Sequence, residues 1–201
     1  MIAEMMLRWM VTIAFAAVGV FCVFRAVTRG PALNRVSDVL HALMCAAMIV
    51  MAWPAGMDFA RVPQLFLFTA ATVWFAGMLV AGVGGHGRWS LAHHALMMGG
   101  MAWMVLVMPT VMAGMTMDGT ASGGAHAGHH TGDATMNMNT PAHVVLVAVV
   151  LAVVFLVAGI AWLARAFDAG RHEETLRMPT AGLAAEGIMS LGMALMAIVL
   201  V

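Results

Sequence analysis

Long apolar segments, separated by short turns, are the feature that most constrains the fold of this chain. Of its 201 residues, 63% are hydrophobic and only 9% are charged, whereas soluble domains carry about 25% charged residues. A chain that crosses a bilayer must satisfy its backbone hydrogen bonds internally, so apolar runs of about 20 residues predict transmembrane helices. The sequence therefore predicts an all-α integral membrane protein.

Glycine, proline and charged residues interrupt the apolar runs and divide the chain into six predicted transmembrane helices. Their expected ranges are Met5 to Thr28, Val36 to Trp53, Gln64 to Val83, Ser90 to Met112, His143 to Ala166 and Pro179 to Val201. Ser37 or Asp38 is expected to cap the second helix. Short connections predict three helical hairpins within one transmembrane domain, residues 1–201.

One pattern occurs three times, on the second helix of each predicted hairpin. An ionisable residue is followed by Met at positions +3, +7 and +10, with Ala or Gly directly before the middle Met. The three copies are His41/Met44/Met48/Met51, His94/Met97/Met101/Met104 and Glu186/Met189/Met193/Met196. Each residue turns a helix by about 100°, so the four positions fall within an arc of about 80°. The pattern predicts a pseudo-repeat on helices 2, 4 and 6; chance matches between Met-dense helices are the alternative.

These residue types favour a soft metal ion. Thioether sulfur suits Cu(I). An ionisable side chain inside a membrane costs at least about 2.5 kcal/mol, which makes a functional role the default hypothesis. If the three helices meet, their side chains form four layers, and Ala47, Gly100 and Gly192 permit close helix approach. A Met-rich core and a hydrogen-bonded His/Glu cluster are the alternatives.

Two neighbouring residues carry secondary expectations. Asp38, one turn before His41, is expected to hold the imidazole in place, as carboxylates near metal ligands do. His93 is expected to face a neighbouring helix or the membrane interface rather than the ladder of Met residues.

A polar stretch at residues 113–142 separates the fourth and fifth predicted helices. It contains no Arg or Lys, and it has too little apolar content to fold alone, so a flexible loop is expected. Its candidate ligands are Met115, Met117, His126, His129, His130, Met136 and Met138. Histidine suits Cu(II), zinc and nickel, and Met narrows the choice toward Cu(I). A low-complexity linker is the alternative.

The arginines predict the orientation in the membrane. Loops after the first, third and fifth predicted helices hold Arg25, Arg29, Arg35, Arg88, Arg165, Arg171 and Arg177. The opposite side holds only Arg8 and Arg61. Cytoplasmic loops carry the excess of positive residues, so both termini and the 113–142 loop are expected to be extracytoplasmic.

The Met-x-x-x-Met spacing, together with the His/Met-rich outer segment, resembles the Ctr-type copper transporters. In that family one such helix per subunit forms stacked Met triads in a homotrimer, whereas here one chain would supply all three copies. The whole chain also resembles an actinobacterial family of small multi-pass membrane proteins classed as a domain of unknown function. The His-Ala-Leu-Met helix starts at His41 and His94, and the Met-Ala-Trp that follows each, carry this resemblance. It implies a bacterial plasma membrane location and no particular activity.

The sequence thus predicts a copper(I)-binding membrane protein whose outer loop collects the ion and whose Met layers bind or conduct it. A b-type haem protein with His41 and His94 as axial ligands, or with Met in place of one of them, is one alternative. An accessory membrane subunit without metal is another. No hydrolytic or phosphate-binding motif is found, so no enzyme is predicted. The net charge of zero gives no indication of nucleic acid, which leaves the metal ion and the lipid bilayer as expected partners.

Overall fold

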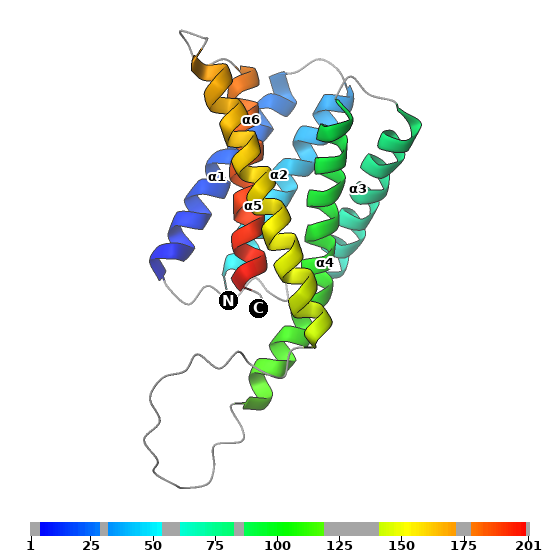
Figure 1. Ribbon diagram of the computed structural model, residues 1–201, viewed down its shortest axis with the longest axis vertical. Helices are drawn as coiled ribbons and strands as arrows, with labels where there is room; N and C mark the ends of the chain where they lie inside the picture. Colours follow the sequence, from blue (N-terminus) through cyan, green and yellow to red (C-terminus); the bar gives the residue numbers. More distant parts are fainter. Residues whose placement is uncertain are drawn as a thin grey trace, which may run out of the picture.

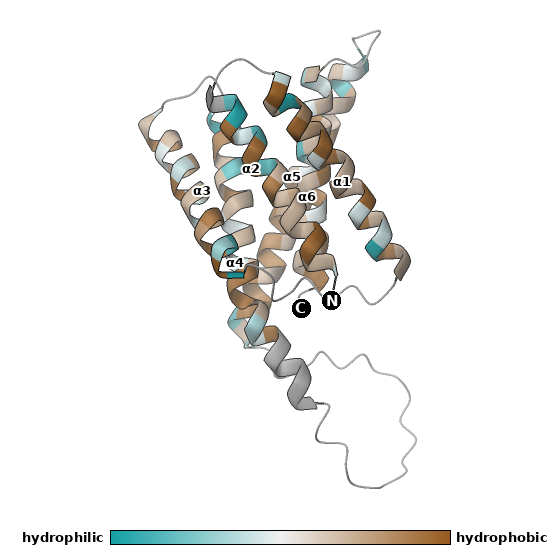
Figure 2. Cartoon of the chain, turned by 180° about the vertical axis from the view of Figure 1, so that it is seen from behind, coloured by the Kyte–Doolittle hydropathy of each residue, from teal (hydrophilic) through white to brown (hydrophobic). Residues whose placement is uncertain are grey.

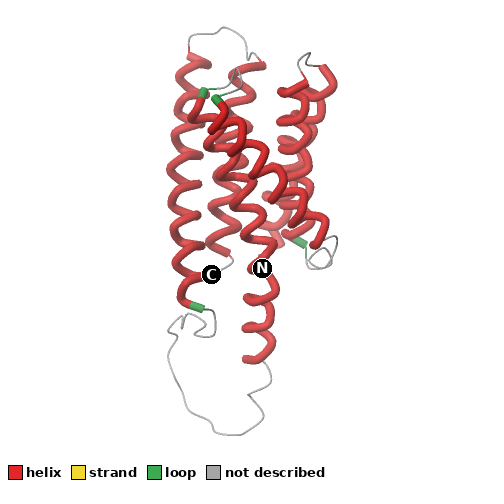
Figure 3. Tube along the Cα trace, turned by 90° about the vertical axis from the view of Figure 1, so that its right-hand side faces the viewer, coloured by secondary structure: helices red, strands yellow, loops and turns green. Residues whose placement is uncertain are grey.

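The structure is a computed structural model that describes residues 5–28, 32–53, 61–82, 87–118, 141–171 and 178–199. For residues 32, 33 and 112–118 it describes the backbone alone. The helices are α1 (Met5–Thr28), α2 (Ala32–Ala52), α3 (Arg61–Ala81), α4 (Arg88–Asp118), α5 (Ala142–Arg171) and α6 (Met178–Val199). Within the described ranges there is no strand, and helix makes up nearly all of the trace (Figure 3).

All six helices are long and apolar enough to cross a membrane. The outer face of α5 illustrates their surface, since Val149, Val153, Val157 and Ile160 are all exposed. Figure 2 shows hydrophobic residues along the length of the helices. A continuous apolar exterior of this kind is favourable in lipid and unfavourable in water. The prediction of an all-α chain with six helices of membrane-spanning length is confirmed.

The helices pack mainly in three pairs of consecutive helices. α1 packs on α2, α3 on α4 and α5 on α6, and α6 also contacts α1 and α4. The helices alternate in direction, so α2, α4 and α6 all begin at the same end of the bundle (Figure 1). The start of α1 and the end of α6 lie at the opposite end. The ionisable residues of the three patterned helices are therefore brought to one end.

Several helix boundaries differ from the prediction. α1 spans the predicted residues, but α2 begins at Ala32, so Ser37 and Asp38 lie inside the helix and do not cap it. α3 begins at Arg61 and includes Pro63 in its first turn, where the missing N–H of proline needs no partner. α5 and α6 begin within one or two residues of the predicted starts.

The fourth helix departs furthest from its predicted end. α4 continues through Pro109 to Asp118, and prolines are tolerated inside membrane helices. The first six residues of the predicted 113–142 loop therefore belong to α4. The prediction for the rest of this loop falls mainly on residues 119–140, which lie outside the described residues.

Small residues on the patterned helices make room for large side chains from other helices. A Cβ atom on Gly192 of α6 would overlap the ring of Phe15 from α1. A Cβ atom on Gly100 of α4 would lie 2.8 Å from Phe155 Cζ of α5 and 3.0 Å from Met193 Cε of α6. Side chains, rather than a neighbouring backbone, fill the space at these two glycines, and the close approach of helices at Ala47, Gly100 and Gly192 stays a prediction.

Candidate metal centre

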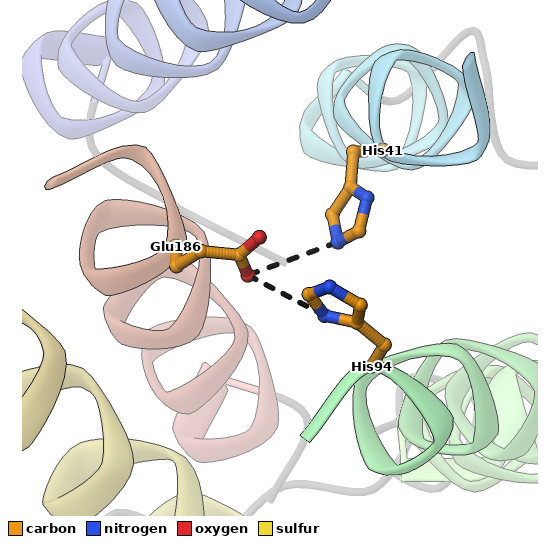
Figure 4. A group of neighbouring side chains, drawn as sticks. All are labelled: His41, His94 and Glu186. Carbon is orange, nitrogen blue, oxygen red and sulfur yellow. Dashed lines mark ion pairs between the residues drawn. The ribbon is translucent and has the colours of Figure 1, made fainter. Parts of the chain in front are cut away.

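Three helices each deliver one ionisable side chain to a common point inside the bundle. His41 of α2, His94 of α4 and Glu186 of α6 each offer one ligand atom, and these atoms lie within 4.8 Å of one another. Glu186 Oε2 is 3.8 Å from His41 Nε2 and 3.7 Å from His94 Nδ1 (Figure 4). Both histidines are buried. The ionisable ends of the three sequence patterns therefore meet.

The orientation of His41 is fixed by its own helix. Its Nδ1 lies 2.7 Å from the backbone oxygen of Ser37. A carbonyl oxygen only accepts hydrogen bonds, so Nδ1 carries the hydrogen and Nε2 of the neutral ring presents a lone pair. That lone pair faces the Glu186 carboxylate at 3.8 Å, which is too long for a hydrogen bond. Among the described residues neither His41 Nε2 nor Glu186 Oε2 has a hydrogen-bond partner, although both are buried.

His94 is held in a related way. Ser90 Oγ, one turn earlier on α4, lies 3.5 Å from His94 Nε2, while Nδ1 is directed at Glu186. The His94 ring meets His41 edge to face, with centroids 4.6 Å apart, and lies 5.3 Å from the Phe75 ring of α3. Hydrogen-bonding groups that orient histidine rings in this manner are typical of metal sites.

The two serines are a signal in the sequence that the predicted ligand pattern does not include. Ser37 and Ser90 each stand four residues before a histidine of the repeated pattern. Residues with this spacing lie on the same face of a helix, one turn apart. The hydroxyl contacts the ring only at Ser90. At Ser37 the backbone oxygen makes the contact, which any residue would supply, so the spacing is informative for the orientation of His94 alone.

His93 joins the cluster, which sequence reasoning did not foresee. It does face a neighbouring helix, since its ring centroid is 5.5 Å from that of Trp162 on α5. Its Nε2, however, lies 3.9 Å from Glu186 Oε2. His93 is 7% exposed, and within the described part of the chain its Nε2 has no hydrogen-bond partner. The position of Glu186 relative to α4, which no sequence pattern encodes, brings both adjacent histidines to one oxygen.

Asp38 has a different role from the one predicted. Its Oδ1 forms an ion pair with Arg25 Nη2 of α1 at 2.9 Å, and both side chains are largely buried. The backbone oxygen of Ser37 instead holds the His41 imidazole. The Arg25–Asp38 pair borders a cavity of about 220 Å³ that His94 and Glu186 also line. Its lining also includes Asn34 and Pro179, which stand near the starts of α2 and α6.

Comparison with known proteins places the chain in a family. Residues 33–200 match the model described as Domain of unknown function (DUF5134). The chain belongs to the DUF5134 family. Uncharacterized protein Rv0970 of Mycobacterium tuberculosis and uncharacterized protein Mb0995 of Mycobacterium bovis are each 32% identical to it over 206 residues, covering 98% of this chain and 96% of the relative. No solved structure matches the chain.

This result confirms the resemblance of the DUF5134 chain to an actinobacterial family of unknown function. The similarity to Ctr-type copper transporters stays a prediction that is based on the Met spacing. The match covers nearly the whole length of this chain and of the relatives, so the similarity is not confined to one segment.

In this DUF5134 chain, the methionines of the repeated pattern follow the His/Glu cluster along α2, α4 and α6. Seven of the nine are at most 2% exposed, and all belong to one buried core: Met44, Met48, Met97, Met101, Met104, Met189 and Met193. Met51 and Met196 are partly buried and pack against that core. Contact between Met193 and the Gly100 position joins α6 to α4 at the level of the middle Met. Whether sulfurs from all three helices converge in each layer stays a prediction.

The remaining predicted ligands cannot be placed. Met115 and Met117 belong to α4, where the structure describes only the backbone. The others lie outside the described residues: His126, His129, His130, Met136 and Met138. The described part of the site is therefore a His/Glu cluster at one end of a buried methionine core.

Proposed function

We propose that this DUF5134 protein is a multi-pass membrane protein of the bacterial plasma membrane that binds copper and handles or transports it as Cu(I). One observation carries the metal-binding part of the proposal: His41 Nε2 and Glu186 Oε2 face each other 3.8 Å apart, and neither of these buried atoms has a hydrogen-bond partner among the described residues. Buried polar atoms that lack a hydrogen-bond partner are unfavourable, and a cation held between them would satisfy both. A separation of 3.8 Å leaves room for an ion and is too long for a shared proton.

The methionine core supports the choice of copper. Met44, Met97 and Met189 each follow a cluster residue by three positions, which is nearly one helical turn. At about 1.5 Å per residue, the ladder from His41 to Met51 is about 15 Å long. Thioethers are soft ligands that favour Cu(I). Several weak sites in series suit an ion that must leave as well as enter.

The arrangement in the membrane is part of the proposal. The three helix pairs α1/α2, α3/α4 and α5/α6 would be pseudo-repeats, because the second helix of each carries the pattern. The arginine distribution favours an orientation with the His/Glu cluster toward the cytoplasm and both termini outside it. Residues 113–142 would then be extracytoplasmic, where their His and Met side chains could collect the ion.

The geometry argues against the haem alternative. A porphyrin must lie between its two axial ligands. The His41 and His94 rings are in edge-to-face contact with centroids 4.6 Å apart, which leaves no space for a porphyrin between them. A Soret band from protein purified after expression with sufficient haem would reverse this preference.

The test is a Cu(I) titration of the full chain in detergent against a competing chelator. The core variant combines Met48→Leu, Met101→Leu and Met193→Leu. The matched control combines Met5→Leu, Met6→Leu and Met10→Leu, because these three methionines on α1 are 64%, 79% and 65% exposed. We expect the core variant to lose at least one Cu(I) per chain while it retains its helical content, and the control to bind as wild type. The same stoichiometry and affinity in all three proteins would refute the methionine sites.

A further inference from the structure

We infer that the His/Glu cluster is a four-donor site for a divalent transition-metal ion of the zinc class, with His93 as the fourth ligand. The inference rests on the proposed metal-binding function and deepens it, because it names a different ion for this end of the bundle. The methionine core would remain the place for Cu(I).

The distances to one oxygen carry this inference. Glu186 Oε2 lies 3.7 Å from His94 Nδ1, 3.8 Å from His41 Nε2 and 3.9 Å from His93 Nε2. Three imidazole nitrogens from two helices thus surround a carboxylate from a third at nearly equal separations. In tetrahedral sites with metal–ligand bonds of about 2.0–2.1 Å, neighbouring donor atoms are about 3.4 Å apart. A contraction of a few tenths of an ångström would bring each nitrogen to this separation from Glu186 Oε2. His41, His94 and Glu186 already have their ligand atoms within 4.8 Å of one another, whereas His93 would also have to move toward the other two rings to complete the site.

The helix geometry explains how adjacent histidines reach the same oxygen. Successive residues on a helix point about 100° apart. The His94 ring lies against His41 of α2 and Phe75 of α3, whereas the His93 ring lies against Trp162 of α5. Glu186 Oε2 of α6 lies 3.7 Å from His94 Nδ1 and 3.9 Å from His93 Nε2. Each ring is therefore supported by a different neighbouring helix, while His93 Nε2 and His94 Nδ1 both face the carboxylate.

If hydrogen bonds held the cluster together, its nitrogen–oxygen separations would be shorter. Hydrogen bonds between nitrogen and oxygen are about 2.7–3.2 Å long, and each of the three separations in the cluster is longer. His41 Nε2 and His93 Nε2 are buried atoms that have no hydrogen-bond partner among the described residues. Buried polar atoms normally find a partner, and a site for an ion is one recognised reason for an exception.

The donor set selects the class of ion. Imidazole nitrogens with one carboxylate oxygen suit Zn(II) and related divalent ions, which prefer four-coordinate sites. The set includes no thioether, so it does not favour Cu(I). The cavity of about 220 Å³ beside His94 and Glu186 gives the ion a route from the end of the bundle. Two chemically distinct binding regions would thus follow each other along the bundle axis.

The experiment uses Co(II) as a spectroscopic probe for the full chain in detergent after treatment with a chelator. Four-coordinate Co(II) absorbs visible light several-fold more strongly than six-coordinate Co(II). We expect wild type to bind Co(II) with the strong absorption, and Zn(II) to displace it. We expect His93→Ala to weaken Co(II) affinity at least tenfold or to lose the strong absorption. The matched control is His143→Ala, because His143 is exposed near the start of α5.

A second measurement uses wild type alone, so its result does not depend on whether the His93→Ala variant folds. With Cu(II) as the probe, electron paramagnetic resonance counts the coordinated nitrogens, and we expect three. Two nitrogens, or an unchanged Co(II) spectrum and affinity in His93→Ala, would overturn the role of His93. Binding of Cu(I) without binding of Co(II) or Zn(II) would overturn the divalent site and leave the proposed function intact. If no metal binds to wild type, both proposals fail.

Discussion

The Nδ1 atom of His41 lies 2.7 Å from the backbone oxygen of Ser37, and this contact determines which ring nitrogen faces Glu186. It fixes the hydrogen on the nitrogen that faces its own helix, so the opposite nitrogen presents its lone pair to Glu186. A backbone acceptor cannot be removed by changing the Ser37 side chain. On α4 the corresponding contact, from Ser90 to His94, is made by a hydroxyl group.

This difference yields a prediction for two serine substitutions. Ser90→Ala removes the hydroxyl that orients His94, and we expect the affinity for Co(II) to fall by about tenfold or more. Ser37→Ala leaves the backbone oxygen in place, so we expect its affinity to stay close to that of wild type. Parallel titrations of the two variants make this comparison. Equal losses in both would show that the hydroxyl groups act in some other way.

Metal binding at the His/Glu cluster and in the methionine core should respond differently to pH. Histidine and glutamate ligands must be deprotonated to bind a metal, so protons compete with Co(II) at the cluster. We expect the apparent Co(II) affinity to decrease as the pH falls, by about tenfold per pH unit for each proton displaced. Thioethers carry no proton, so Cu(I) binding by the methionines should change little. Titrations at several pH values check both expectations, and identical pH profiles for the two ions would contradict the assignment of separate sites.

The packing of Phe15 against Gly192 predicts a strongly coupled pair. Gly192→Ala would place a Cβ atom within the Phe15 ring, and overpacking of this kind costs about 1–3 kcal/mol or more. We expect a clear fall in the melting temperature. In a Phe15→Ala background the same substitution should be nearly neutral, because the ring is absent. Gly77→Ala is the control, since a Cβ atom there meets nothing within 4 Å.

We expect the loss of one charge of the buried Arg25–Asp38 ion pair to destabilise the protein more than the loss of both charges. Arg25→Ala removes the cation 2.9 Å from the Asp38 carboxylate, and breaking a buried pair on one side costs about 3–5 kcal/mol. The double substitution Arg25→Ala/Asp38→Asn should recover part of that loss. The control is Arg165→Ala, because Arg165 is exposed and lies over Trp162. Thermal melts of the four proteins test this, and a double variant that melts no higher than Arg25→Ala would contradict it.

Periodicity predicted the helices of this chain better than their ends. The apolar run that forms α1 has the observed bounds, because no competing signal lies within it. At α2 the capping potential of Ser37 suggested a start that is too late, although Pro31 directly precedes the helix in the sequence and proline is favoured at such a position. Local capping preferences are worth about 1 kcal/mol, and tertiary packing of an apolar helix readily exceeds that.

The candidate site was predicted in part, for a physical reason. The spacing of His41, His94 and Glu186 relative to the methionines identified which face of each helix matters. It could not identify His93, because its role depends on where α6 places Glu186 between two directions on α4. It also could not assign Asp38 to Arg25, since that pairing depends on how α1 packs against α2. Angular position along one helix can be read from sequence, whereas relative placement of helices cannot.

Helix α1 contributes contacts that the rest of the bundle needs in order to be stable. The family match covers residues 33–200 and leaves out α1. Yet the Phe15 ring occupies the space over Gly192, and Arg25 supplies the countercharge to Asp38. A polypeptide cut at residue 33 would keep every predicted metal ligand, but it would expose a hollow on α6 and remove the cation from a buried carboxylate. The boundary of the family match thus falls inside the smallest piece of this protein that is expected to be stable.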